Sequence, residues 1–170
     1  AKGSGAIISF DPNLRENLWD SLDKAREKIA YGISECDILK ISDNEIQWFT
    51  GEQDFDRAVE ILRGRYGNIK LMLLSLGKNG SRAYCGENSA FAPAVPANTI
   101  ETTGAGDTFC GGILAKVLEY GLRNYSAEEL MGILNYANSA AGIVTERRGA
   151  LKVMPSPAEI NERMERITND

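Results

Sequence analysis

The residues of this sequence that are best suited to chemistry lie at positions 102–108, immediately before an apolar run. Gly104 and Gly106 let backbone N–H groups turn toward a common point, and Ala105 adds no bulk there. A helix that begins at this point presents unpaired N–H donors and the positive end of its dipole, which suits an anion such as a phosphoryl group. Asp107 then stands beside the anion, where a carboxylate can accept a proton from an attacking hydroxyl. The pattern predicts phosphoryl transfer.

A structural interpretation of the same stretch stays open. Gly-rich turns before helices are common, and an Asp in a first helical turn often only complements the dipole. Short motifs of this kind also match unrelated proteins by chance. Because the sequence has no histidine, carboxylates, Lys and Tyr are left for acid–base chemistry, so a carboxylate base at Asp107 agrees with the composition.

Composition restricts the class of protein. At 170 residues, with 43% hydrophobic and 25% charged residues, the chain fits one globular domain with a substantial core. The net charge of −5 and the lack of a basic run argue against nucleic-acid binding. No apolar stretch is long enough to span a membrane, and the N-terminus lacks a secretory pattern. Three widely separated cysteines without histidine give no metal-binding pattern and favour reduced thiols in the cytoplasm.

Strand and helix patterns alternate along the chain and must position the residues above. Short apolar or alternating runs predict strands at residues 6–10, 37–41, 69–74 and 81–85. Amphipathic spacing and capping signals predict helices at residues 18–33, 54–65, 105–120 and 126–144, with shorter ones before Gly51 and from Ser156 onward. The alternation predicts an α/β fold with a mainly parallel sheet and no internal domain boundary.

Two further segments offer ligand-binding groups. Residues 11–15 (Asp-Pro-Asn-Leu-Arg) follow the first expected strand, at the end where open α/β sheets usually bind ligands. Asn13 and Arg15 offer donors for phosphate or sugar oxygens, although a turn with a surface Arg explains them equally well. Residues 42–45 are typical of a helix N-cap followed by first-turn acids, Glu45 among them.

These segments occur in the same order in the PfkB (ribokinase-like) carbohydrate kinases. The sequence resembles this family over nearly its whole length and is most similar to the fructokinases. The resemblance implies a ribokinase-like fold, with a mainly parallel three-layer sheet and flanking helices, and ATP-dependent phosphorylation of a sugar hydroxyl, foremost that of fructose. Asp107 would be the general base, and Gly104, Ala105 and Gly106 would form the anion hole. The matching segments are residues 11–15, 39–45 with 50–51, 75–81, 102–114 and 137–142.

The same resemblance assigns roles to residues outside the anion loop. Arg15 would face the sugar and the transferred phosphate, and Glu45 would hold Mg²⁺ through water. Ser42 stands where many members have Asn, so its own role stays open. Turn formation by the glycines and a buried, hydrogen-bonded Asn are the structural alternatives for the nucleotide-side residues. The residues expected to border the nucleotide are Asn13, Ser75, Gly77, Gly80 and Asn138.

A monovalent-cation site is a further implication of the resemblance. Glu101 and Thr103 occupy positions that belong to such a site in several members, and backbone carbonyls of residues 147–150 would contribute to it. Glu101 is longer than the usual Asp, yet K⁺ remains an expected cofactor. Otherwise Arg147 and Arg148 simply complement the dipole at a helix C-terminus.

Members of the family are normally much longer than 170 residues, and the resemblance begins about midway along them. Residues 1–170 would then be the C-terminal portion of a kinase, without the N-terminal half, its sugar contacts and its lid. We expect such a chain to be inactive alone, and the complete protein to bind a sugar and ATP, with a homodimer through the lid as an option. Ketodeoxygluconate or ribose kinases and a catalytically silent nucleotide-binding fragment are the alternatives.

Overall fold

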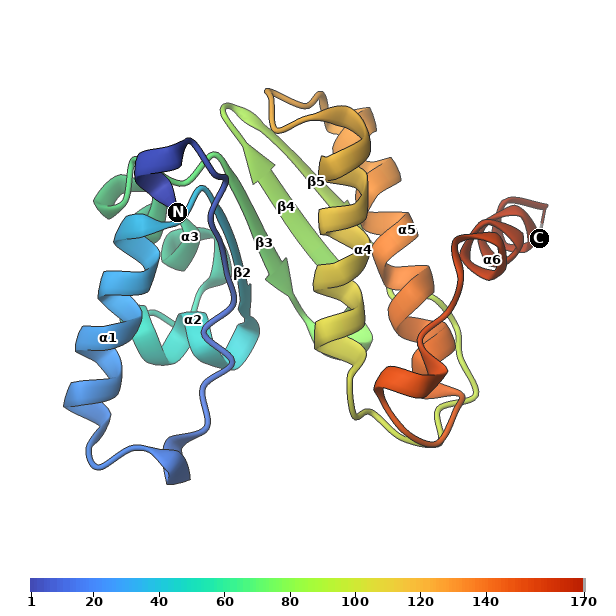
Figure 1. The fold of residues 1–170 in the computed structure, drawn as a ribbon, viewed down its shortest axis with the longest axis horizontal. Helices are drawn as coiled ribbons and strands as arrows, with labels where there is room; N and C mark the ends of the chain where they lie inside the picture. Colours follow the sequence, from blue (N-terminus) through green and yellow to red (C-terminus); the bar gives the residue numbers. More distant parts are fainter. Residues whose placement is uncertain (170) are drawn as a thin grey trace. The chain divides into compact units, whose positions relative to one another are not determined.

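Helices and strands alternate along the chain, and helices flank the strands, so the predicted α/β class is confirmed (Figure 1). The computed structural model describes residues 1–169. They divide into two units. The first comprises Ala1–Ser75 with Tyr84–Gly86, and the second comprises Leu76–Ala83 with the residues from Glu87 onward.

The first unit is built on three parallel strands. Their order is β1 (Ser9–Phe10), β2 (Ile38–Ser42) and β3 (Leu71–Ser75). Ile38 pairs with Ser9 on one side and with Leu71 on the other. Four of the five residues in β2 and in β3 are buried, as expected for parallel strands that are covered on both faces.

Three helices complete the first unit: α1 (Leu22–Glu35), α2 (Asp43–Thr50) and α3 (Phe55–Arg65). Each begins at a polar N-cap whose side chain accepts a hydrogen bond from the first turn, as helix starts require. Helix α1 approaches β1 so closely that a Cβ on Gly32 would come within 2.5 Å of the Phe10 ring. A glycine at this position therefore sets the distance between helix and strand.

Two predicted boundaries in the first unit are wrong by three residues or more. The first helix was expected to begin at Leu18, but the Ser21 side chain caps Lys24, and the helix begins one residue after Ser21. Leu18 lies in a short 3₁₀ turn and is exposed, so it is not part of this helix although its spacing from the following apolar residues is helical. The first strand is shorter than residues 6–10, because the Ile8 N–H group is bound by the Asp37 carboxylate instead of a neighbouring strand.

The second unit begins with a 3₁₀ turn at Gly77–Asn79 and contains most of β4 (Ser81–Cys85), all of β5 (Asn88–Ala92) and three helices. Strand β5, the neighbour of β4 in the sheet, was not predicted. Three of its five residues are exposed, so it lacks the apolar alternation of a half-buried strand. Gly80 is required at the start of β4: its φ is +99°, and a Cβ there would come 2.2 Å from the Ala92 carbonyl oxygen.

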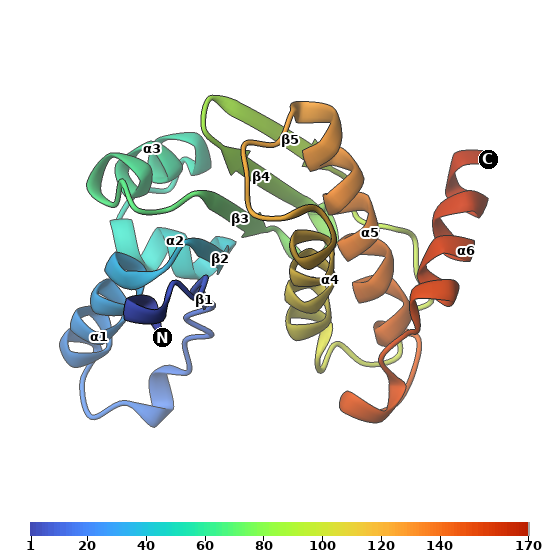
Figure 2. The same ribbon diagram turned by 45° about the horizontal axis from the view of Figure 1, so that its top comes forward.

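Helices α4 (Ala105–Tyr120) and α5 (Ala127–Thr145) pack side by side (Figure 2). Gly112 of α4 lies close to the backbone of Ala137 in α5. Helix α6 (Pro157–Asn169) lies along α5 and contributes Ile160 to a cluster with Tyr136, Ala140 and Ile143. The predicted start and end of α4 are confirmed, as is the capping box that opens α5. This pair of helices is the scaffold that carries the loop at residues 102–108.

Among the described residues no helix is long and apolar enough to cross a membrane. The three cysteines are thiols; Cys36 and Cys85 are buried, and Cys110 is partly buried. Burial raises the pKa of the Cys36 thiol to about 11. Within residues 1–169 these thiols form no disulfide and belong to no group of metal-ligating side chains.

Candidate active site

The loop before α4 leaves the start of that helix open. Gly104 is its N-cap, in a left-handed conformation with φ +80°, and no side chain caps the helix. The Thr108 N–H group donates to the Gly104 carbonyl at 2.8 Å, and the Ala105 N–H group donates to Thr102 at 3.2 Å. The N–H groups of Gly106 and Asp107 belong to the first turn, where a helix supplies no acceptor of its own. The start of α4 is thus shaped to receive an anion.

Asp107 is the third residue of α4, and its side chain is exposed. Glu45 in α2, Glu129 in α5 and Glu159 in α6 hold the same position in their helices. Each of these glutamates closes a capping box with the serine three residues before it. Asp107 cannot do so, because Gly104 has no side chain. Its carboxylate therefore stays at the open helix start, free of the structural role that the other three acids perform.

The segment around Glu101 lies against the same loop. The Glu101 carboxylate accepts hydrogen bonds from the Thr103 hydroxyl and from the Gly149 N–H group, and these bonds lower its pKa. A Cβ on Gly104 would come 3.2 Å from the Ala150 Cβ. The structure thus brings together Glu101, Thr103 and part of the 147–150 segment, the groups expected to bind K⁺. Whether they hold a cation remains a prediction.

Helix α6 secures the far side of this cluster. Arg147 donates to the Val153 carbonyl at 3.1 Å and forms an ion pair with Glu159. The pKa of Glu159 falls to about 2, first because it accepts the Ser156 N–H group and next because of Arg147. Arg147 therefore does more than complement the end of α5: it ties the 147–150 segment to the start of α6.

Asn138 is buried in the second unit, and both its amide oxygen and its amide nitrogen form hydrogen bonds. Its carbonyl oxygen accepts the Ser81 hydroxyl at 2.9 Å, and its amide nitrogen donates to Pro93 at 3.0 Å and Ala92 at 3.3 Å. These bonds join α5 to the start of β4 and the end of β5, next to the turn that contains Gly77 and Gly80. The arrangement matches the structural alternative of a buried, satisfied Asn, and an adenine contact remains a prediction.

In the first unit, residues 11–15 form a turn that a partly buried ion pair holds. Asp11 contacts Lys40 Nζ at 3.0 Å and accepts the Asn13 N–H group at 3.2 Å. Asn13 has φ +44°, a left-handed conformation that few residues other than glycine adopt. Burial raises the pKa of Asp11, and the Lys40 ammonium partly offsets the rise. Arg15, at the end of this turn, is exposed.

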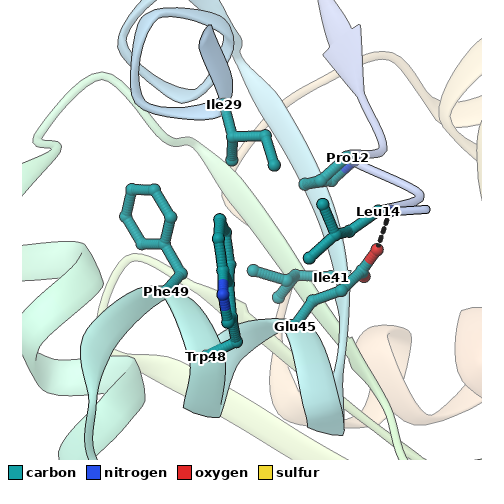
Figure 3. A pocket seen from close by; sticks show the side chains of 7 residues that line it. All are labelled: Pro12, Leu14, Ile29, Ile41, Glu45, Trp48 and Phe49. Atoms are coloured by element: carbon teal, nitrogen blue, oxygen red, sulfur yellow. Dashed lines mark hydrogen bonds between the residues drawn. The ribbon is translucent and has the colours of Figure 1, made fainter. Parts of the chain in front are cut away.

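Glu45 connects that turn to α2. One carboxylate oxygen accepts the Ser42 N–H group and hydroxyl at 2.9 and 2.8 Å, and the other accepts the Leu14 N–H group at 2.7 Å. Figure 3 shows this last bond at the edge of a small pocket. Ser42, whose role the sequence left open, is the N-cap of α2. The pocket is lined by Pro12, Leu14, Ile29, Ile41, Glu45, Trp48 and Phe49.

The donor set suits a metal that keeps its own water. No group of three or more His, Cys, Asp or Glu side chains gathers as a metal centre in the described part of the chain. A carboxylate has about four acceptor positions, and Glu45 uses three of them in the bonds above. One position is left for a metal-bound water, which agrees with the way Mg²⁺ is usually held.

The predicted site residues fall in both units. The first unit holds Asn13, Arg15, Glu45 and Ser75, which ends β3 and is partly buried. Lys40 was not singled out from the sequence, although a charged residue within the apolar run Ile38–Ser42 signals a buried partner. The second unit holds Gly77, Gly80, Glu101, Thr103, Gly104, Ala105, Gly106, Asp107 and Asn138.

Comparison with known proteins agrees with this description. Residues 1–157 match the family described as "pfkB family carbohydrate kinase". The chain is 35% identical to "Probable fructokinase-2" of Arabidopsis thaliana over 159 residues, 94% of this chain and 48% of that protein. It is 32% identical to "Fructokinase-1" of Zea mays over 166 residues, 98% of this chain and 51% of that protein. The chain therefore spans about half the length of these relatives.

Solved structures give the same result. A fructokinase from Vibrio cholerae O395 with fructose, ADP and calcium bound superimposes with a TM-score of 0.85 at 26% identity, over 96% of this chain and 52% of that one. Aminoimidazole riboside kinase from Salmonella enterica, bound to aminoimidazole riboside and an ATP analogue, gives a TM-score of 0.81 at 28% identity, over 96% and 54%. The predicted ribokinase-like architecture is thereby confirmed. From the family match over most of its length, this chain belongs to the pfkB family of carbohydrate kinases.

Proposed function

We propose that the chain is the C-terminal portion of a kinase that transfers the γ-phosphoryl group of ATP to a sugar hydroxyl, with fructose as the preferred acceptor. The observation that carries the proposal is the start of α4, where an uncapped Gly-rich turn presents N–H groups beside an exposed acid. Membership of the carbohydrate kinase family and the fructokinase relatives support the acceptor class.

In this proposal Asp107 accepts the proton of the attacking hydroxyl as its oxygen bonds to the γ-phosphorus, while the bond from that phosphorus to the β,γ-bridging oxygen breaks and ADP leaves. The N–H groups at residues 104–107 stabilise the negative charge on the transferred phosphoryl group. Those of Gly106 and Asp107 are best placed, because the Ala105 N–H group already donates to the Thr102 carbonyl. Arg15 is expected to bind phosphate oxygens. Mg²⁺, when bound with the nucleotide, supplies charge neutralisation at the phosphates; Glu45 would hold one of its waters.

Two measurements test the proposal. Calorimetric titration of ATP into the 170-residue chain should show binding that requires Mg²⁺, with a folded sample verified by circular dichroism. Fructose phosphorylation should be absent or poor with this chain and restored in the full-length kinase, because sugar positioning and exclusion of water need the remaining half. Negligible heat with and without Mg²⁺ from a folded sample would contradict the nucleotide site.

A catalytically silent nucleotide-binding protein is the second candidate. Such a protein would bind ATP normally, yet no added acceptor and no restored N-terminal half would produce turnover. Among active alternatives, ribose and ketodeoxygluconate remain acceptors to be compared with fructose in the same assay.

A further inference from the structure

Lys40 is the most deeply buried cation described in the first unit. It is the third residue of β2, is 6% exposed, and stands between Leu39 and Ile41, which are fully buried. A buried ammonium group is costly unless a carboxylate neutralises it. Lys40 Nζ lies 3.0 and 3.2 Å from the two carboxylate oxygens of Asp11, so both oxygens face the same cation.

The Asp11 carboxylate, held by Lys40, also binds the backbone of the turn. The oxygen 3.2 Å from the ammonium also accepts the Asn13 N–H group, which closes a turn two residues long. Asn13 needs such support because its φ is +44°. The next N–H group, that of Leu14, is held by Glu45 at 2.7 Å. Two consecutive amides before Arg15 are thus fixed by carboxylates.

We propose that Lys40 is a positioning residue that orients the Asp11 carboxylate to close the turn at Asn13, and thereby sets the path along which the backbone presents Arg15. The geometric part concerns the first unit alone. The consequence for catalysis rests on the proposed function, in which Arg15 binds phosphate oxygens.

The first unit also contains a matched control. Lys70 pairs with Asp37 at 2.9 Å, and Asp37 accepts the Ile8 N–H group at 2.9 Å, so the order lysine, aspartate, backbone amide is the same. The side chain of Lys70 is 63% exposed, whereas that of Lys40 is 7% exposed. Water can replace Lys70 as a partner of its aspartate, but it has little access to Asp11 through Lys40.

Amide hydrogen exchange of the folded 170-residue chain, followed by NMR, tests the geometric part. In Lys40→Met, exchange at Asn13 should become roughly tenfold faster or more relative to the core amide of Leu73, since a bond to a charged acceptor is lost. In Lys70→Met, exchange at Ile8 should change by less than about threefold, as expected for an exposed pair. Unchanged exchange at Asn13, or an increase no larger than at Leu73, would overturn the proposal.

A second variant covers the case in which Lys40→Met does not fold. Asp11→Asn with Lys40→Met removes both charges, which often restores stability, while the Asn oxygen can still accept a hydrogen bond. The proposal expects fast exchange at Asn13 in this double variant, because nothing orients the acceptor. Protection equal to that of the parent chain would overturn it.

The catalytic consequence is measured separately in the full-length kinase. If Lys40 acts through Arg15, Arg15→Met should reduce kcat much less in the Lys40→Met background than in the parent enzyme. Additive losses would reject the link to Arg15. A parent enzyme without turnover would instead count against the proposed function, and the exchange result would still decide the role of Lys40.

Discussion

The starts of α4 and α5 differ at the N-cap, and that difference separates a candidate catalytic acid from a structural one. Both helices have an acidic residue in the third position, Asp107 and Glu129. Ser126 caps α5 and closes a box with Glu129, whereas Gly104 caps α4 without a side chain and with a left-handed backbone. At these two helix starts the N-cap therefore decides whether the first-turn acid is engaged in a capping box.

The capping boxes show what a structural acid does. Arg123 and the Ser126 N–H group lower the pKa of Glu129 to about 2, so its charge is used within the fold. At α4 the helix dipole and the unused N–H groups have no side-chain anion to satisfy them at the N-cap. A helix start that the protein leaves uncapped is available to a ligand, and the following predictions test that contrast.

The largest effect is expected from Asp107→Asn in the full-length kinase. The change keeps size and removes the proton acceptor, so turnover should fall by roughly 10²–10⁴. ATP affinity should stay within a few-fold, since loss of a negative charge does not weaken binding of an anion. Initial rates and calorimetry on one preparation measure both. Near-normal turnover from a folded variant would remove Asp107 as the base.

Gly104→Ala tests the backbone of the open helix start. Ala at φ +80° is strained, and its Cβ would lie 3.2 Å from Ala150, so the free energy of unfolding should fall by about 1–2 kcal/mol. Gly111→Ala on the same helix is the control, because a Cβ there meets nothing within 4 Å. A Gly-to-Ala change inside a helix should stabilise by about 0.5–1 kcal/mol. Urea unfolding of both variants that gave the same sign would contradict this account.

Ser126→Ala tests the same comparison at the start of α5. Loss of this cap should lower the free energy of unfolding by about 1 kcal/mol and the melting temperature by roughly 2–4 °C. ATP binding and turnover should not change, because the box serves α5 alone. A loss of turnover that exceeds the loss of folded protein would show that the Ser126–Glu129 box also serves the chemistry, and the distinction between the starts of α4 and α5 would fail.

Local signals in the sequence predicted α4 and α5 well. The glycines at 104 and 121 bound α4, and the Ser126–Glu129 box opens α5, because caps depend on residues within one turn. The predicted helix start at Leu18 is wrong because the local cap at Ser21 is a stronger start signal than apolar spacing. Strand β5 was missed because its stability comes from neighbouring elements and not from its own pattern.

Long-range partners lay beyond prediction from the sequence. Asn138 was singled out, but its bonds reach Ser81 and Pro93, 57 and 45 positions away. Lys40 and Asp11 are 29 positions apart, and only the fold shows that they pair. The motifs therefore located the candidate site residues, whereas the contacts that orient those residues required the structure.

The smallest expected effect concerns the acid that closes the box of α6. The folded pKa of Glu159 is about 2, below its ordinary value of 4.5, so the unfolded chain binds more protons between these values. The stabilising contribution of Glu159 is therefore complete above about pH 5 and is lost as the pH falls toward 2.

The difference in unfolding free energy between the parent chain and Glu159→Gln should be constant from pH 7 to 5 and should shrink from pH 5 to 3. Urea unfolding at each pH measures this difference, with Glu162→Gln, an exposed acid of the same helix, as the control. A difference that does not depend on pH would mean that Arg147 and Ser156 leave the Glu159 carboxylate unperturbed, and the 147–150 segment would then have no electrostatic tie to α6.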